Sequence, residues 1–231
     1  MDEYVIKPIA HIHNDLKTKF GVPRQSGLAG SLLSEIVFTP EFRVSDALRG
    51  ITDFSHIWLI WSFSEARRSD WSPTVRPPRL GGNERIGVFA TRSPYRPNSL
   101  ALSCVKLVRV EHRDGLGDIL VVSGADLMNG TPIYDIKPYL PYADAIGDAT
   151  GGFAPDGGKT LCVVDENCEM QKLSEAKRTA LTELLARDPR PQYHDDPNRV
   201  YGMEYGEYEV KFRVDGKELF ITSIEKQIKK R

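Results

Sequence analysis

Apolar and polar residues alternate over several short segments of this chain, a pattern typical of β-strands with one buried face. The clearest segments are residues 33–38 (LSEIVF) and 100–110 (LALSCVKLVRV), and the short apolar run 119–122 (ILVV) predicts another strand. Turn residues separate these segments, and Asn129-Gly130 is a strong signal for a hairpin turn. Many short strands with turns at regular spacing favour a closed or nearly closed antiparallel barrel.

Two apolar runs predict strands of other kinds. Residues 51–63 include FSHIWLIWSF, a nearly continuous run of β-branched and aromatic residues, which predicts a strand buried on both faces. Val88-Phe89-Ala90 predicts a short strand that leads into an Arg-containing loop.

The C-terminal part of the chain has a different pattern. Ser174 is suited to cap a helix whose apolar face ends before Pro189. Asp215-Gly216 predicts a two-residue hairpin loop, with Arg213 opposite Glu218. In that hairpin one face would carry four apolar residues, namely Val210, Phe212, Leu219 and Ile221.

Between these two parts the composition shifts to DATGGFAPDGGKT, residues 148–160. The segment resembles a phosphate-binding loop, but an extra Gly breaks the spacing and a strand pattern follows where a helix is needed. We interpret it as a linker. The predicted fold is mainly β, with a small antiparallel β-barrel domain over residues 1–148, a linker over 149–160 and a small α+β domain over 161–231.

Composition and charge narrow the classes of protein. Hydrophobic residues make up 40% of the 231 positions and charged residues 27%, as in soluble globular proteins. No apolar run approaches a membrane span, and three cysteines argue against a disulfide framework and for a reducing, cytoplasmic location. The cysteine spacing predicts no metal site. The formal net charge is −1, yet residues 67–96 carry seven Arg against Asp70 and Glu84, a local charge that suits a bound polyanion.

Four stiff, polar loops are the best candidates for a binding site. They are Pro23-Arg24-Gln25, Arg76–Gly82, Arg92–Asn98 and Asp126–Lys137. In the third loop Pro94 and Pro97 restrict the backbone around Arg92 and Arg96, and guanidinium groups bind carboxylates and phosphates well. The residues alone predict a barrel with an Arg-rich binding face, or a stiff surface turn with solvated Arg.

Six motifs, in order, resemble the TrmO (TsaA-like) family of tRNA methyltransferases. They are PRQSGL, TVRPPRLGG, IGVFATRSPYRPN, DLMNGTP, DIKPYLPYAD and DPRPQY. The resemblance implies methylation of N6-threonylcarbamoyladenosine at tRNA position 37, on N6, with S-adenosyl-L-methionine as the methyl donor. It also implies a small β-barrel methyltransferase domain that holds this cofactor, and a homodimer that binds the tRNA anticodon loop.

The resemblance also implies a set of cofactor-binding residues. Family members often carry Asp where this chain has Asn129, and a His-Gln pair where it has Ser64-Glu65. The implied set is Pro23, Arg24, Gln25, Ser64, Glu65, Arg92, Leu102, Asp126, Leu127, Met128, Asn129, Gly130 and Thr131.

Further roles are hypotheses within the same resemblance. Asp135 or Tyr139 would accept the proton from N6, and Lys137 would hold the threonyl carboxylate or a phosphate. Contacts to RNA, or in part to a second subunit, are expected from Arg67, Arg68, Arg76, Arg79, Arg96, Asn98 and Arg190. Two alternatives remain open: an RNA-binding module with a degenerate pocket, and a methyltransferase of the same superfamily that acts on another substrate.

Overall fold

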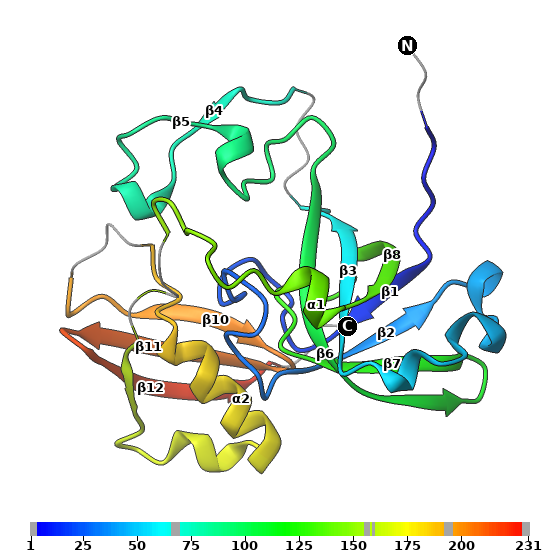
Figure 1. Cartoon of the computed structure of the whole chain (residues 1–231). Helices are drawn as coiled ribbons and strands as arrows, with labels where there is room; N and C mark the ends of the chain where they lie inside the picture. The colour runs from blue at the N-terminus through cyan, green and yellow to red at the C-terminus, as the bar shows by residue number, and fades with distance from the viewer. Residues whose placement is uncertain (1–3, 66–69, 155–157, 159, 192–195, 228–231) are drawn as a thin grey trace.

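The computed structural model describes residues 4–65, 70–154, 158, 160–191 and 196–227. Six antiparallel strands form a ring in which the last strand pairs with the first (Figure 1). The order around this ring is β1 (Ala10–His13), β2 (Leu33–Phe38), β7 (Gly117–Ser123), β6 (Leu100–Arg113), β3 (His56–Ser62) and β8 (Pro132–Pro138). The prediction of a mainly β fold is therefore confirmed.

Alternating burial along the strands builds the core of the ring. In β3 the side chains of Ile57, Leu59 and Trp61 are buried, whereas the intervening side chains are only partly covered. The prediction of a strand buried on both faces was wrong. On the outer side of β3, Trp58 Nε1 donates to Asp144 Oδ2 (3.0 Å), at the end of α1 (Pro141–Asp144).

A loop excursion connects β3 to β6 and extends away from the ring (Figure 1). It contains the short pair β4 (Thr74–Val75) and β5 (Ile86–Gly87). Val88–Ala90 follows as a 3₁₀ turn, so the strand predicted for these residues was wrong. Only Val88 of the turn is buried, because a turn of this length points its successive side chains in different directions.

Asn129-Gly130 does form a turn, but it closes no hairpin. It joins β7 to β8, and these strands pair with other neighbours in the ring. The backbone of the turn bonds the N-terminal strand region instead, since the Gly130 N–H donates to the Ile12 carbonyl (2.7 Å). The sequence therefore predicted the turn correctly, but the pairing of strands in the ring decided which strands it connects.

A second sheet and a helix make up the C-terminal unit. Its strands are β9 (Cys162–Val164), β10 (Tyr201–Tyr205), β11 (Tyr208–Asp215) and β12 (Glu218–Lys226), in the order β10-β11-β12-β9. The helix α2 (Glu175–Ala186) has Ser174 as its N-cap, as predicted.

The hairpin β11–β12 has the predicted buried face and a different register. Asp215 pairs with Glu218, and Arg213 lies opposite Phe220 rather than Glu218. The loop therefore consists of Gly216 and Lys217, with Gly216 at φ +57°. The new register places the Arg213 guanidinium 4.1 Å from the centre of the Phe220 ring.

The molecule has two apolar cores, one inside the ring and one in the C-terminal unit. The core of the C-terminal unit includes residues from both sides of the predicted domain boundary. Leu16, Ala29 and Leu32 belong to the same buried cluster as α2 and the C-terminal sheet. The segment 15–32, which lacks a periodic apolar pattern, thus packs on the C-terminal unit. Of the helices in the described part of the chain, none has the length and apolar character needed to span a membrane.

Candidate cofactor and RNA site

Three loops that are distant in sequence meet beside the ring. Arg92 Nη1 donates to Gln25 Oε1, and the Arg92 charge and the Ser26 backbone both favour the ionised form of Asp126. The loops can meet because the backbones at Gly27 and Gly124 approach each other closely. The Gly27 N–H donates to the Gly124 carbonyl (2.8 Å), and a Cβ on Gly124 would stand 3.2 Å from Gly27 Cα.

The Asp126 carboxylate is held from inside the ring. Ser103 Oγ donates to Asp126 Oδ1 (2.5 Å), and the buried Trp61 Nε1 donates to Ser103 Oγ (2.9 Å). Burial raises the pKa of Asp126 above its ordinary value, although the hydrogen bond from Ser103 and the charge of Arg92 oppose the rise. The result is a positioned carboxylate beside a guanidinium, at the edge of the core.

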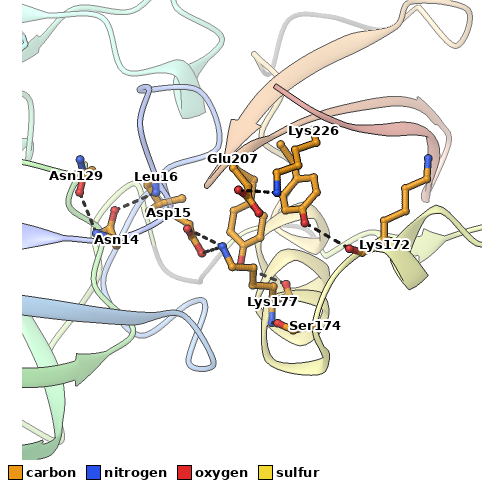
Figure 2. A network of polar contacts seen from close by, with 11 residues as sticks. Asn14, Asp15, Leu16, Asn129, Lys172, Ser174, Lys177, Glu207 and Lys226 are labelled. Atoms are coloured by element: carbon orange, nitrogen blue, oxygen red, sulfur yellow. Dashed lines mark hydrogen bonds and ion pairs between the residues drawn. The ribbon is translucent and has the colours of Figure 1, made fainter. Parts of the chain in front are cut away.

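The turn that follows Asp126 is fastened to the segment after β1 (Figure 2). Asn129 Oδ1 accepts from the Asn14 backbone (3.1 Å), and the Asn129 backbone donates to the Leu16 carbonyl (2.7 Å). Asn14 Nδ2 also donates to the Leu127 carbonyl (2.9 Å). An oxygen suffices for the contact that the Asn129 side chain makes here, so Asn in place of Asp retains the acceptor.

The same segment bonds the C-terminal unit on its other side. Lys177 Nζ of α2 donates to Asp15 Oδ1 (2.9 Å), and the Gly206 N–H donates to the Asp15 carbonyl (2.8 Å). Figure 2 shows Asn14 directed toward Asn129 and Asp15 toward Lys177. Residues 14–16 therefore connect the Asp126–Thr131 turn with the C-terminal unit.

The other residues of the predicted cofactor set take several positions. Leu102 is an exposed residue of β6 next to Ser103, and Leu127 and Thr131 are buried in the turn. Lys19 Nζ donates to the Glu65 carbonyl (2.7 Å), which brings the segment with Ser64 close to the 19–25 loop. Met128 is partly buried, Gly130 is exposed and Pro23 is buried.

Arg24 points away from this group, toward the C-terminal unit. Its Nη2 donates to the Arg190 carbonyl (3.4 Å), and its pKa is lowered by burial and, to a smaller extent, by Arg79, while Asp188 opposes this. A cavity of about 360 Å³ lies here between loop 19–24 and the end of α2. It is lined by Arg24 and Arg187, not by Arg92 or Asp126.

The predicted catalytic residues lie on and just after β8. Lys137 Nζ lies 3.2 Å from Asp135 Oδ2, so the two share one face of the strand, as their spacing predicts. Both side chains are substantially exposed, and the Tyr139 ring packs near His56 and Trp58. Among the described residues, no hydrogen bond joins these three side chains to Arg92 or Asp126.

The predicted RNA-binding residues differ in how accessible they are. Arg67 and Arg68 lie outside the described residues. Arg76 and Asn98 are exposed, whereas Arg190 is 11% exposed and forms an ion pair with Asp188 (2.8 Å). Arg96 Nη1 donates to the carbonyls of Val88 (3.1 Å) and Thr91 (2.7 Å), so it holds its own loop together.

Comparison with known proteins identifies the family of this chain. A model of the tRNA-methyltransferase O (TrmO) N-terminal domain matches residues 11–145, and a model of the TrmO C-terminal domain matches residues 163–227. The chain belongs to the TrmO family. The resemblance seen in the sequence motifs is thereby confirmed.

Relatives within the TrmO family cover nearly the whole chain. A tRNA (adenine(37)-N6)-methyltransferase of Escherichia coli (strain K12) is 39% identical over 224 residues, which are 93% of this chain and 94% of that protein. A protein of the same name from Eikenella corrodens is 48% identical over 164 residues, 70% of this chain and 92% of its own. A crystal structure of TrmO from P. aeruginosa superimposes with a TM-score of 0.80 at 31% identity, covering 98% of this chain and 99% of that one.

Sequence reasoning missed three residues of the candidate site: Asn14, Trp61 and Ser103. For Ser103 a signal was available, because a polar residue occupies an inward position of the strand 100–110, between apolar neighbours. Such a residue must find a hydrogen-bond partner when it is buried. The hydrogen bonds that join Asn14 to Leu127 and Asn129 carried no such signal, since these partners lie more than a hundred positions away in the chain.

Proposed function

We propose that this TrmO-family chain methylates N6 of the adenine at position 37 of tRNA, with S-adenosyl-L-methionine as the methyl donor. We take the adenine to carry the threonylcarbamoyl group, as the family resemblance implies. The observation that carries the proposal is the meeting of Gln25, Arg92 and Asp126 beside the Asp126–Thr131 turn, in a chain similar over nearly its full length to the Escherichia coli enzyme.

The polar groups suit S-adenosyl-L-methionine, which carries a carboxylate, an ammonium and a sulfonium. Arg92 would hold the carboxylate, and Asp126 would attract the positive groups. Exposed Leu102 would cover an apolar part of the cofactor, and the backbone of the Asp126–Thr131 turn would offer hydrogen bonds to it. When bound, the cofactor supplies an electrophilic methyl group, so the protein's main tasks are to align the acceptor nitrogen and to exclude water.

The proposal also covers the domains, the RNA contacts, the location and the oligomeric state of the protein. The ring would serve as the β-barrel methyltransferase domain over residues 1–148, with 149–160 as a linker and 161–231 as a C-terminal domain that adds contacts to RNA. Arg76, Arg79 and Asn98 would meet phosphates of the anticodon loop. The enzyme would act in the cytoplasm as a homodimer.

The decisive experiment measures methyl transfer to tRNA with and without the threonylcarbamoyl modification. Transfer to modified tRNA alone supports the proposal. Transfer to another substrate only would favour a different methyltransferase of the superfamily. Calorimetry that detects RNA binding without S-adenosyl-L-methionine binding would favour an RNA-binding module.

Asp135 is the proposed proton acceptor, with Lys137 3.2 Å away. The ureido N6 is a weak nucleophile, so loss of a base lowers the rate of the chemical step, by about a hundredfold. Asp135→Asn is therefore expected to slow single-turnover methylation while the affinity for S-adenosyl-L-methionine stays the same. An unchanged rate would remove Asp135 from this role, and Tyr139→Phe would then test the second candidate.

A further inference from the structure

Two aromatic side chains stack on each other at the surface of the excursion. The rings of Trp71 and Phe89 have centroids 6.2 Å apart and planes that differ by 21°. Trp71 is 49% exposed and Phe89 is 71% exposed. Single exposed apolar residues are common, but two stacked rings from separate segments form a flat apolar surface in contact with water.

The backbone of the excursion holds this pair in place. The Val88 N–H donates to the Pro73 carbonyl (2.9 Å), and the Ser72 N–H donates to the Tyr95 carbonyl (3.2 Å). The 3₁₀ turn buries Val88 and leaves Phe89 outside. These bonds position the two rings on a loop that has little other regular structure.

A fixed positive charge lies over the Phe89 ring. The Arg96 guanidinium is 5.6 Å from the centre of the Phe89 ring, and its two bonds to backbone carbonyls keep it there. Exposed Arg76 and Arg85 belong to the same excursion. Aromatic rings combined with Arg are the features that proteins use to bind unpaired bases of RNA, because a base stacks on the ring while the Arg attracts the phosphates.

The pair also lies close in the chain to the candidate cofactor site. Phe89 is three residues before Arg92, which bonds Gln25. We propose that Trp71, Phe89 and Arg96 form a platform on which an unpaired base of the tRNA anticodon loop stacks. This inference rests on the proposed function. The platform holds the loop open beside the methyl donor.

The first test uses an RNA stem-loop with the anticodon-loop sequence of a substrate tRNA, and a set of versions with single abasic loop nucleotides. Phe89→Leu keeps an apolar side chain and removes the aromatic face, so the full-length variant is expected to bind the stem-loop about tenfold more weakly. For one of the abasic stem-loops, the affinity of the parent protein is expected to fall by the same factor of about ten. Phe89→Leu is expected to bind that abasic stem-loop as weakly as it binds the intact one. Phe220→Leu is the matched control, since Phe220 also lies beneath an Arg, on the C-terminal sheet.

Salt dependence separates stacking from charge. Phe89→Leu is expected to lower affinity equally at every salt concentration, whereas Arg76→Ala lowers the slope of log affinity against log salt by about one. Quenching of Trp71 fluorescence on RNA addition, lost in Trp71→Phe with affinity retained, supports the same stack.

Two results would overturn the inference. Equal stem-loop affinity of parent and Phe89→Leu would exclude the platform, and so would a change in sedimentation that shows Phe89 to be a contact between two copies of the chain. Failure of the parent protein itself to bind the stem-loop would contradict the proposed function instead.

Discussion

Asp126 is positioned by two buried residues of the ring, Trp61 and Ser103. Because Trp61 donates to Ser103, the Ser103 hydroxyl proton is left to point at the carboxylate. A tryptophan inside the ring thus orients a group at its edge. This arrangement lets the apolar core control the direction of a charged side chain.

Trp61→Phe is expected to weaken S-adenosyl-L-methionine binding about threefold to fivefold, because Ser103 would lose the donor that orients it. The ring remains, so the loss in unfolding free energy should be about 1 kcal/mol. Calorimetry and denaturant unfolding measure the two effects. Trp58→Phe is the control, since its Nε1 bonds Asp144 on the outer side of β3; an equal loss of affinity in that variant would contradict the relay.

The buried carboxylate also predicts a dependence on pH. Burial raises the folded-state pKa of Asp126 above the unfolded value of 3.8, so the folded chain binds more protons in the interval between the two values. The contribution of Asp126 to stability therefore falls as pH rises through that interval.

Asp126→Asn removes the charge and retains an oxygen that can accept from Ser103. We expect the variant to be at least as stable as the parent at pH 7, with its relative advantage shrinking at pH 4, while S-adenosyl-L-methionine binds at least tenfold more weakly. Denaturant unfolding at both pH values and calorimetry at pH 7 measure this. A variant less stable than the parent at pH 7 would show that the ionised carboxylate stabilises the fold.

At the scale of elements, the connection between β1 and α2 is the feature that joins the two units of the chain. Gly206, in the turn between β10 and β11, is necessary for it. At φ +57° a side chain is strained, and a Cβ there would stand 2.5 Å from Asp15 Oδ1 and 2.8 Å from Lys177 Nζ. No side chain fits without displacing this ion pair.

Gly206→Ala is expected to lower the unfolding free energy by about 2 kcal/mol, through backbone strain and loss of the Asp15–Lys177 contact. Gly216→Ala supplies a matched control, because Gly216 has the same φ of +57° with no atom within 4 Å of an added Cβ. The difference between the two variants in denaturant unfolding isolates the contact. Equal losses would mean that the ion pair moves aside without cost.

At the scale of the whole molecule, the segment after β1 packs into the C-terminal core, while Asn14 bonds the Asp126–Thr131 turn beside the ring. Leu16 is 1% exposed and lies in the cluster formed with α2 and the C-terminal sheet. The C-terminal unit is therefore completed by residues from the beginning of the chain. Its packing and the position of the Asp126–Thr131 turn depend on the same few residues.

Leu16→Ala is expected to cost about 3 kcal/mol of unfolding free energy. Hydrogen exchange should speed up in α2 and β11, which contribute to the same buried cluster as Leu16, more than in β7 of the ring. Leu33→Ala, at a position 49% exposed, should have little effect. Faster exchange confined to the ring would contradict the assignment of Leu16 to the C-terminal core.

Local patterns in the sequence were sufficient for several elements. The strand 33–38, the capped helix α2 and the buried face of the β11–β12 hairpin follow from side-chain periodicity, because burial on one face imposes it directly. The family motifs also indicated which loops to bring together. The structure joins Gln25, Arg92 and Asp126, all of which those motifs contain.

Other features were decided by contacts between distant residues. Val88–Ala90 has the composition of a strand, yet the excursion folds it as a turn that exposes Phe89. The Asn129-Gly130 turn bonds residues 12–16 rather than closing a hairpin, and the loop between β11 and β12 is Gly216-Lys217 rather than Asp215-Gly216. Each of these depends on which partner a backbone meets, and the alternation of side chains carries no information about that.

The sequence by itself thus determined the family, the mainly β architecture and the loops that carry the candidate chemistry. Only the tertiary structure decided that Trp61 and Ser103 orient Asp126, that Asn14 and Asp15 connect the turn to α2, and that Trp71 and Phe89 lie side by side. The physical reason is the same in each case. A hydrogen bond or ring contact depends on distances in space, and chain closure brings together residues whose separation in sequence is long.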